Sequence, residues 1–146
     1  MYTKDWVQQL LNLRPPYSVQ KVQLRTEDDR PVGIDIFLTV EPEYRPRFKN
    51  ANDVQFYDHE ACTWQHLSIF QLPCYLHCNV PRYRLKTLRS NREYIRRIPV
   101  PFAGKKTELT SQLESYAMKL IELHGNIASV SKQLGLQPLQ FKRKTG

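Results

Sequence analysis

The stretch Cys74-Tyr-Leu-His-Cys-Asn-Val-Pro-Arg-Tyr-Arg84 alternates apolar and polar residues through its first half. Successive side chains of a β-strand point to opposite faces, so this alternation predicts a strand with one apolar face. The residues of that face are Cys74, Leu76, Cys78 and Val80. The other face holds Tyr75 and His77. Neighbouring runs predict further strands over 54–58, 64–70 and 93–98, so a sheet around residues 74–84 decides the fold.

Two runs nearer the N-terminus predict a β-hairpin with strands 17–25 and 32–40. The second strand has an apolar face made of Ile34, Ile36, Leu38 and Val40. Residues 27–31 between the strands are acidic and end in proline, which is typical of a turn. Residues 3–13 predict a short amphipathic helix that ends before Pro15-Pro16. Its expected apolar stripe is Trp6, Leu10 and Leu13, with Leu11 beside it.

Beyond a proline-rich linker at 99–104, the apolar period changes from 2 to 3.6, which indicates helices. The first is expected over 107–123, with Thr107 as its cap. Its stripe would be Leu109, Leu113, Tyr116, Leu120 and Leu123. Gly125 ends this helix, Asn126 caps a second over 127–134, and Gly135 ends the second. The sequence therefore predicts an α+β protein with two domains. Residues 1–103 would form a small antiparallel β unit with an N-terminal helix, and 104–146 a helix-turn-helix bundle.

The composition is that of a soluble globular protein, with 40% hydrophobic and 25% charged residues. No apolar run approaches the roughly 20 residues that span a bilayer, and the N-terminus lacks a signal-peptide pattern. Three cysteines cannot all pair, which argues against a secreted disulfide scaffold. We therefore expect a cytoplasmic protein without a membrane partner.

The net charge of +8 is concentrated in the C-terminal part of the chain. Residues 82–106 alone contain nine basic residues and one acidic residue, Glu93. Such a field attracts polyanions, and Tyr83 or Tyr94 could stack on a base. A solvated sheet edge whose charges prevent aggregation is the structural alternative. The candidate nucleic-acid-binding residues of this segment are Arg82, Arg84, Lys86, Arg89, Arg92, Arg96, Arg97, Lys105 and Lys106.

A helix-turn-helix is expected over 127–146, with its turn at 135–137 and a recognition helix starting at Pro138. Ser131 supplies the small residue that lets two helices approach, and Phe141 supplies an inward apolar side chain. The exposed positions of the last helix would then contact bases and phosphates in the major groove. These are Gln140, Lys142, Arg143 and Lys144. A plain helical hairpin with a basic tail is the alternative.

Metal binding and catalysis have weak sequence support. His59-x-x-Cys62 and Cys74-x-x-His77 have a zinc-like spacing, yet Cys74 and His77 would point to opposite faces of a strand. No nucleophile is paired with a base, and the acids cluster in turns. We therefore expect no metal, no cofactor and no enzymatic activity.

Three segments in this order resemble the N-terminal region of the ISL-three family of insertion-sequence transposases. They are Trp64-Gln-His-Leu67, Tyr75-Leu-His-Cys-Asn-Val-Pro-Arg-Tyr-Arg84 and Val100-Pro-Phe-Ala103. The resemblance implies a zinc-finger-like β region followed by a helix-turn-helix that binds DNA. The family's zinc cysteines would fall just after Phe48 and near 86–89, where this chain has none. It thus implies a degenerate, metal-free zinc-ribbon-like unit without the family's catalytic domain.

Together, these features lead us to expect a non-catalytic protein that binds double-stranded DNA, a domesticated transposase fragment from a mobile element. A different class is also open. A small basic inhibitor or adaptor, encoded by a phage or mobile element, would bind a larger protein or nucleoprotein complex. A truncated transposase remnant is the third possibility. DNA binding should weaken steeply with salt, whereas a protein interface with an apolar centre should not.

Overall fold

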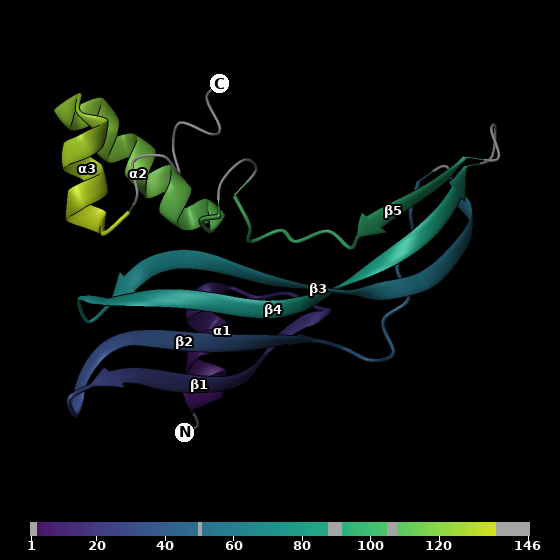
Figure 1. The fold of residues 1–146 in the computed structure, drawn as a ribbon, viewed down its shortest axis with the longest axis horizontal. Helices are drawn as coiled ribbons and strands as arrows, with labels where there is room; N and C mark the ends of the chain where they lie inside the picture. The colour runs from purple at the N-terminus through teal and green to yellow at the C-terminus, as the bar shows by residue number, and fades with distance from the viewer. Residues whose placement is uncertain (1–2, 50, 88–91, 105–107, 137–146) are drawn as a thin grey trace. The chain divides into compact units, whose positions relative to one another are not determined.

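The computed structural model describes residues 3–49, 51–87, 92–104 and 108–136, and these form an α+β fold (Figure 1). Within those ranges, no helix is long and apolar enough to cross a membrane. The positions expected in the third helix, including Pro138 and Phe141, lie outside the described residues. The elements are α1 (Thr3–Leu11), β1 (Tyr17–Glu27), β2 (Arg30–Val40), β3 (Ala51–Ile69), β4 (Leu72–Thr87), β5 (Glu93–Arg97), α2 (Ser111–His124) and α3 (Ile127–Leu134).

The five strands form one mixed sheet, in which the order β1-β2-β4-β3 is extended by β5 pairing with β4. The arrows of β2 and β4 point the same way in Figure 1, so these neighbours are parallel. The expectation of a purely antiparallel unit was therefore wrong. The connection between β2 and β3, residues 41–50, is long enough to carry the chain past the position that β4 later fills.

Two-residue turns connect β1 to β2 and β3 to β4. The predicted hairpin at 17–40 is confirmed, and Asp28 and Asp29 at its turn both have positive φ, 51° and 61°. Phe70 and Gln71 join β3 to β4 with φ values of 51° and 64°. Positive φ at both central residues is the requirement of a type I′ turn, which non-glycine residues other than Asn and Asp seldom meet. The separate strands expected at 54–58 and 64–70 are instead one strand, β3.

The chain divides into two compact units that interleave along the sequence. The first unit contains 1–21, 37–62 and 77–100, and the second contains 22–36, 63–76 and 101–146. Strands β1 to β4 contribute residues to both units. The sequence boundary expected after residue 103 stays a prediction.

The strand faces predicted to be apolar are confirmed. Buried in the structure are Ile34, Ile36, Leu38, Cys74, Leu76, Cys78 and Val80, and Val40 is half-buried. The stripe expected for α1 is right only in part: Leu11 is buried, but Val7 is buried with it while Trp6 and Leu10 are exposed. A hydrogen bond joins this helix to β1: the Gln8 side-chain carbonyl accepts from the Val19 N–H at 3.1 Å.

Helices α2 and α3 pack against each other in the second unit (Figure 1). Asn126 caps α3, and Gly125 and Gly135 end the two helices in the left-handed region, as predicted. The cap of α2 is Thr110 and not Thr107, since the Thr110 hydroxyl oxygen accepts from the Leu113 N–H at 3.3 Å.

The buried face of α2 agrees with the predicted stripe at Leu113 and differs from it at Tyr116 and Leu123. Leu113 and Ala117 are buried, whereas Tyr116 is exposed and Leu123 is 77% exposed. The inward position at 117 is small, which allows α3 to approach, and Ser131 on α3 is fully buried, as its predicted packing role requires. The shared core is Leu109, Leu113, Ala117, Val130 and Leu136.

A buried histidine joins β3 to the start of α2. The His66 side chain is 8% exposed, and its Nδ1 lies 2.7 Å from the Thr110 hydroxyl oxygen that caps the helix. Backbone hydrogen bonds from the Gln65 N–H to the Glu108 carbonyl and from the Thr110 N–H to the Gln65 carbonyl, both 2.9 Å, fix the same contact. Burial lowers the pKa of His66 from 6.5 to about 4.

This histidine should make the second unit less stable in mild acid. The unfolded chain takes up a proton near pH 6.5 and the folded chain only near 4, so the stability present above 6.5 is lost as the pH falls towards 4. Between pH 7.5 and 5 we expect a loss of about 2 kcal/mol from this group. Urea unfolding at both pH values should show a smaller loss for His66→Gln. His124→Gln, at an exposed site on α2, should behave as wild type. An equal loss in wild type and His66→Gln would contradict this assignment.

Candidate nucleic-acid interface

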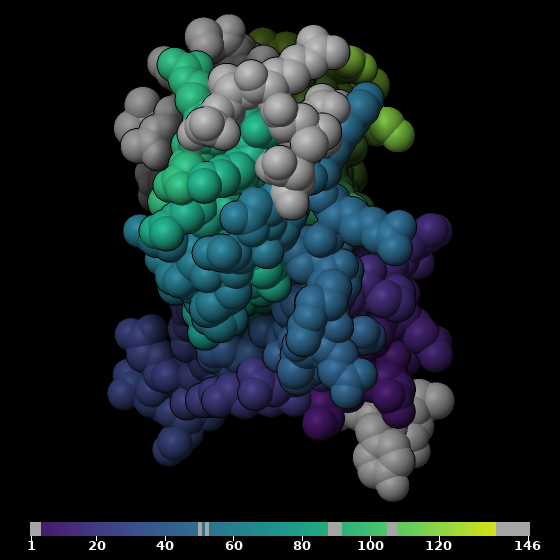
Figure 2. All heavy atoms as spheres, turned by 90° about the vertical axis from the view of Figure 1, so that its right-hand side faces the viewer, coloured from purple at the N-terminus to yellow at the C-terminus, as the bar shows by residue number. Residues whose placement is uncertain are grey.

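The basic segment folds in the first unit as an antiparallel ribbon, here called the basic ribbon, made of residues 82–87 of β4, of β5 and of Arg92, which precedes β5. Arg82 pairs with Arg97, Tyr83 with Arg96 and Lys86 with Glu93. The Thr87 N–H donates to the Arg92 carbonyl at 3.3 Å and continues the register. All five residues of β5 are exposed. In Figure 2 the green atoms of β4 and β5 lie beside the blue atoms of β3 and of the loop before it.

Directly paired residues share a face, so the ribbon has two different sides. One side carries Arg82 with Arg97, then Arg84 with Ile95, then Lys86 with Glu93. The opposite side carries Tyr83 with Arg96, then Leu85 with Tyr94. Continuing the register places Arg92 on this second side, opposite Thr87. The second side therefore presents Arg92, Tyr94 and Arg96 along β5, with no acidic residue among them.

Two of the predicted cations are held by acids of β3. The Arg82 guanidinium donates two hydrogen bonds to the Asp58 carboxylate, at 2.6 and 2.5 Å, and its Nη1 lies 3.6 Å from Glu60. This guanidinium lowers the pKa of the Asp58 carboxyl. Arg97 lies 3.7 Å from Glu60 and donates to the Cys62 sulfur at 3.5 Å. Arg82 and Arg97 therefore join the ribbon to β3, and part of their charge is neutralised.

Four of the predicted cations, Arg84, Lys86, Arg92 and Arg96, differ from Arg82 and Arg97 in their surroundings. The Arg84 guanidinium lies 5.2 Å from the centre of the Tyr57 ring, and that of Arg96 lies 5.9 Å from the Tyr94 ring. Lys86 and Arg92 are exposed. Among the residues that the structure describes, none of the four forms an ion pair with a carboxylate. The structure thus divides the predicted set into paired and unpaired cations, which the sequence alone did not separate.

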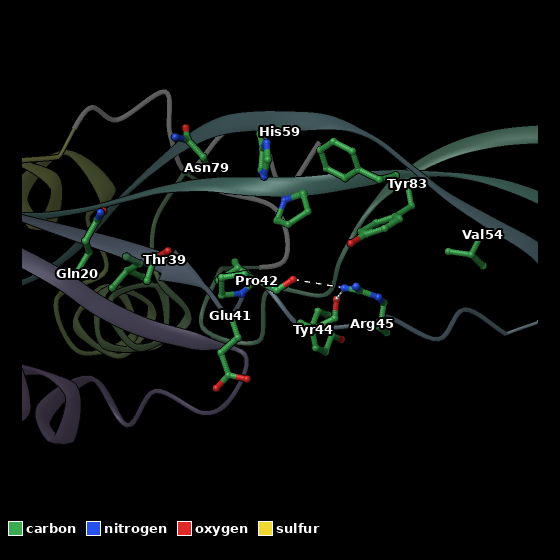
Figure 3. A pocket seen from close by; sticks show the side chains of 14 residues that line it. Gln20, Thr39, Glu41, Pro42, Tyr44, Arg45, Val54, His59, Asn79 and Tyr83 are labelled. Atoms are coloured by element: carbon green, nitrogen blue, oxygen red, sulfur yellow. Dashed lines mark hydrogen bonds between the residues drawn. The ribbon is translucent and has the colours of Figure 1, made fainter.

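Beside the ribbon, the first unit contains a hollow of about 770 Å³, here called the aromatic hollow (Figure 3). His59 of β3 and Tyr83 of β4 face the loop that carries Pro42, Tyr44 and Arg45. The guanidinium of Arg45 is positioned by hydrogen bonds to the carbonyls of Pro42 and Tyr44, at 3.3 and 3.2 Å. The other residues around the hollow are Gln20, Leu38, Thr39, Val40, Glu41, Val54, Phe56, Asn79 and Pro81.

Four rings follow one another, and three of them, Tyr83, Phe56 and His59, line the hollow. Phe48 lies 6.2 Å from Tyr83 between ring centres, Tyr83 lies 5.7 Å from Phe56 edge to face, and Phe56 lies 5.0 Å from His59. In a regular strand, residues 56 and 59 would point to opposite faces. The alternation is interrupted between them, because Tyr57 and Asp58 both contact Arg82 on the other side. A local break of this kind, as in a β-bulge, turns His59 towards Phe56 and the hollow.

Sequence reasoning missed this hollow. The sequence suggests His59 only as a possible zinc ligand and Phe56 only as part of a strand. The break in side-chain alternation between these two residues cannot be recognised from composition or from the strand period. A signal was present in the concentration of Phe56, Tyr57 and His59 within four residues. The predicted residues Arg89, Lys105, Lys106, Gln140, Lys142, Arg143 and Lys144 lie outside the described residues.

The described part of the chain contains no group of three or more His, Cys, Asp or Glu side chains that could hold a metal ion. Burial raises the pKa of the Cys78 thiol to about 11 and, with a contribution from the Asp35 carboxylate, that of Cys74 to about 12. Burial and a hydrogen bond to Glu60 raise the pKa of Cys62. In this state the thiols are protonated at neutral pH, and Cys74 and Cys78 pack as small apolar side chains.

Comparison of the chain with protein-family models, curated proteins and solved structures finds no match, so the likeness to the transposase N-terminal region stays an expectation from the residues quoted above.

Proposed function

We propose that this protein binds DNA without catalysing a reaction on it, and that the basic ribbon is its main phosphate contact. The observation that carries the proposal is the set of four cations on the ribbon that form no ion pair with a carboxylate among the described residues. They are Arg84, Lys86, Arg92 and Arg96. Arginine and lysine side chains bind phosphate oxygens, and each contact releases condensed counterions from the nucleic acid.

The shape of the ribbon supports this proposal. β5 pairs with β4 and its residues are exposed, so cations on both sides of the ribbon, Arg84 and Lys86 on one and Arg92 and Arg96 on the other, are accessible to phosphates. Arg84 and Lys86 are two residues apart on a strand, which separates them by about 7 Å, so their side chains can contact different phosphates of one DNA strand. These contacts would position the protein on DNA with little sequence preference.

Two finer parts of the proposal come from the sequence. The resemblance to a transposase N-terminal region agrees with a domesticated, metal-free DNA-binding unit. Helix α3, packed on α2, would be the helix before the turn of a helix-turn-helix, which adds selectivity if residues 138–146 form the recognition helix. In that arrangement Gln140, Lys142 and Arg143 would read bases.

Salt dependence tests the proposal on the unaltered protein. Four phosphate contacts give a slope of log K against log salt of about −3.6, so affinity for a duplex should fall about 100-fold between 50 and 200 mM salt. Fluorescence anisotropy with two duplexes of unrelated sequence should give the same slope for both. No measurable duplex binding at 50 mM salt, or an affinity independent of salt, would overturn the proposal. The second result would favour an interface with an apolar centre, as expected for a protein-binding inhibitor.

A further inference from the structure

We propose that the aromatic hollow takes an unstacked nucleobase from a single-stranded stretch of nucleic acid, and that Arg96 and Arg92 hold the phosphates next to it. The inference rests on the proposed function in one respect, since the same ribbon supplies the phosphate contacts. It adds a site that duplex binding does not need. It therefore predicts a preference for single-stranded or locally melted DNA over an intact duplex.

The first argument is the exposure of the rings. Phe56 is 55% exposed although it contacts both Tyr83 and His59. An apolar ring exposed at the edge of a hollow offers a flat face, and every base can stack on such a face. The hollow of about 770 Å³ falls within the size range of small-molecule sites, which is ample for one base.

The second argument is the chemistry around the rings. Gln20, His59 and Asn79 are exposed at the hollow, and their side chains carry the donors and acceptors that pair with base edges. No hydrogen bond within the described residues occupies the amide groups of Gln20 and Asn79. Glu41 is the one carboxylate in the lining, and it is exposed to solvent.

The third argument is the continuity between hollow and ribbon. Tyr83 lines the hollow and pairs directly with Arg96, so the ring and the guanidinium share one side of the ribbon. Tyr94 and Arg92 continue along β5 on that same side. Alternating rings and cations on one surface are the arrangement by which proteins bind single strands, with bases on rings and phosphates on cations.

The test compares a 12-nucleotide single strand with the matching 12-base-pair duplex by fluorescence anisotropy. Phe56→Ala should weaken binding of the single strand about 10-fold, since stacking of one base contributes about 1 to 3 kcal/mol. Its affinity for the duplex should stay within about twofold. The matched control is Phe70→Ala, because Phe70 also lies on the β3–β4 hairpin and is 82% exposed, but belongs to the second unit. This control should change neither affinity.

Phe56→Trp keeps a ring and adds a reporter. It should retain wild-type affinity, and its fluorescence should be quenched by the single strand and not by the duplex. Asn79→Ala, at an exposed site, provides an independent test if Phe56→Ala misfolds. It should weaken binding of the single strand and leave binding of the duplex unchanged. The inference fails if the wild type prefers the duplex, or if Phe56→Ala and Asn79→Ala both bind the single strand as wild type does. A third outcome separates the two proposals. If the wild type binds the single strand in a manner that depends on Phe56 but does not bind the duplex, the proposed duplex binding is refuted and the base site is supported.

Discussion

Replacing the four unpaired cations of the basic ribbon by glutamine is expected to weaken duplex binding at least about 100-fold at 50 mM salt. The substituted residues are Arg84, Lys86, Arg92 and Arg96. Each lost phosphate contact removes about 0.9 from the slope of log K against log salt, so the slope should approach zero. Glutamine is chosen because a polar side chain at these exposed positions avoids an apolar patch that would promote aggregation.

The matched control removes the same charge from elsewhere on the surface. It replaces four exposed cations outside the ribbon by glutamine: Lys4, Arg14, Arg30 and Lys119. If only total charge attracts DNA, both variants lose affinity alike, and the ribbon has no special role. If the ribbon binds phosphates, the control keeps most of its affinity and a steep salt slope. Arg82→Gln provides a further comparison, because its guanidinium is engaged by Asp58 and should matter less per charge than Arg84.

Val130→Asp should disrupt the packing of α3 on α2 and cost at least about 3 kcal/mol of local stability. Val130 is fully buried between Leu113 and Ala117 of α2 and the segment at Leu136. A carboxylate there would lose its hydration without gaining a described cationic partner. Hydrogen exchange of the α2 and α3 amides should become markedly faster, which local measurement detects even when the two units do not unfold together.

Ile127→Asp is the control on the same helix. Ile127 is exposed and stands at the first turn of α3, where a negative charge interacts favourably with the helix dipole. Exchange in this variant should match wild type. Since the basic ribbon belongs to the first unit, Val130→Asp should keep its non-specific DNA affinity within about twofold. A large loss of affinity would show that the helices, and not the ribbon, supply most of the binding.

Much of the fold could be predicted because short-range patterns encode it. The apolar alternation at Ile34–Leu38 and Cys74–Val80 located two buried strand faces, and Gly125, Asn126 and Gly135 located the helix boundaries. The errors came from choosing between neighbouring apolar residues. On α1 and α2, Val7 and Ala117 are buried beside Leu11 and Leu113, while larger side chains such as Trp6 and Leu123 face solvent. Hydrophobicity alone favours the larger residue, whereas close packing of two elements favours the smaller one.

The candidate site divides in the same way. The local sequence by itself determined that strands lie near 74–84 and 93–98 and that the segment between and around them is rich in arginine and tyrosine, because charge and strand period are both properties of neighbouring residues. Tertiary structure alone decided which of these cations are available, since Asp58 and Glu60 reach Arg82 and Arg97 from another strand. It also created the aromatic hollow. There, a break in the side-chain alternation of β3 turns His59 towards Phe56. The loop carrying Tyr44 and Arg45 lines the same hollow as Tyr83, almost forty residues away in the sequence, and no local pattern predicts this proximity.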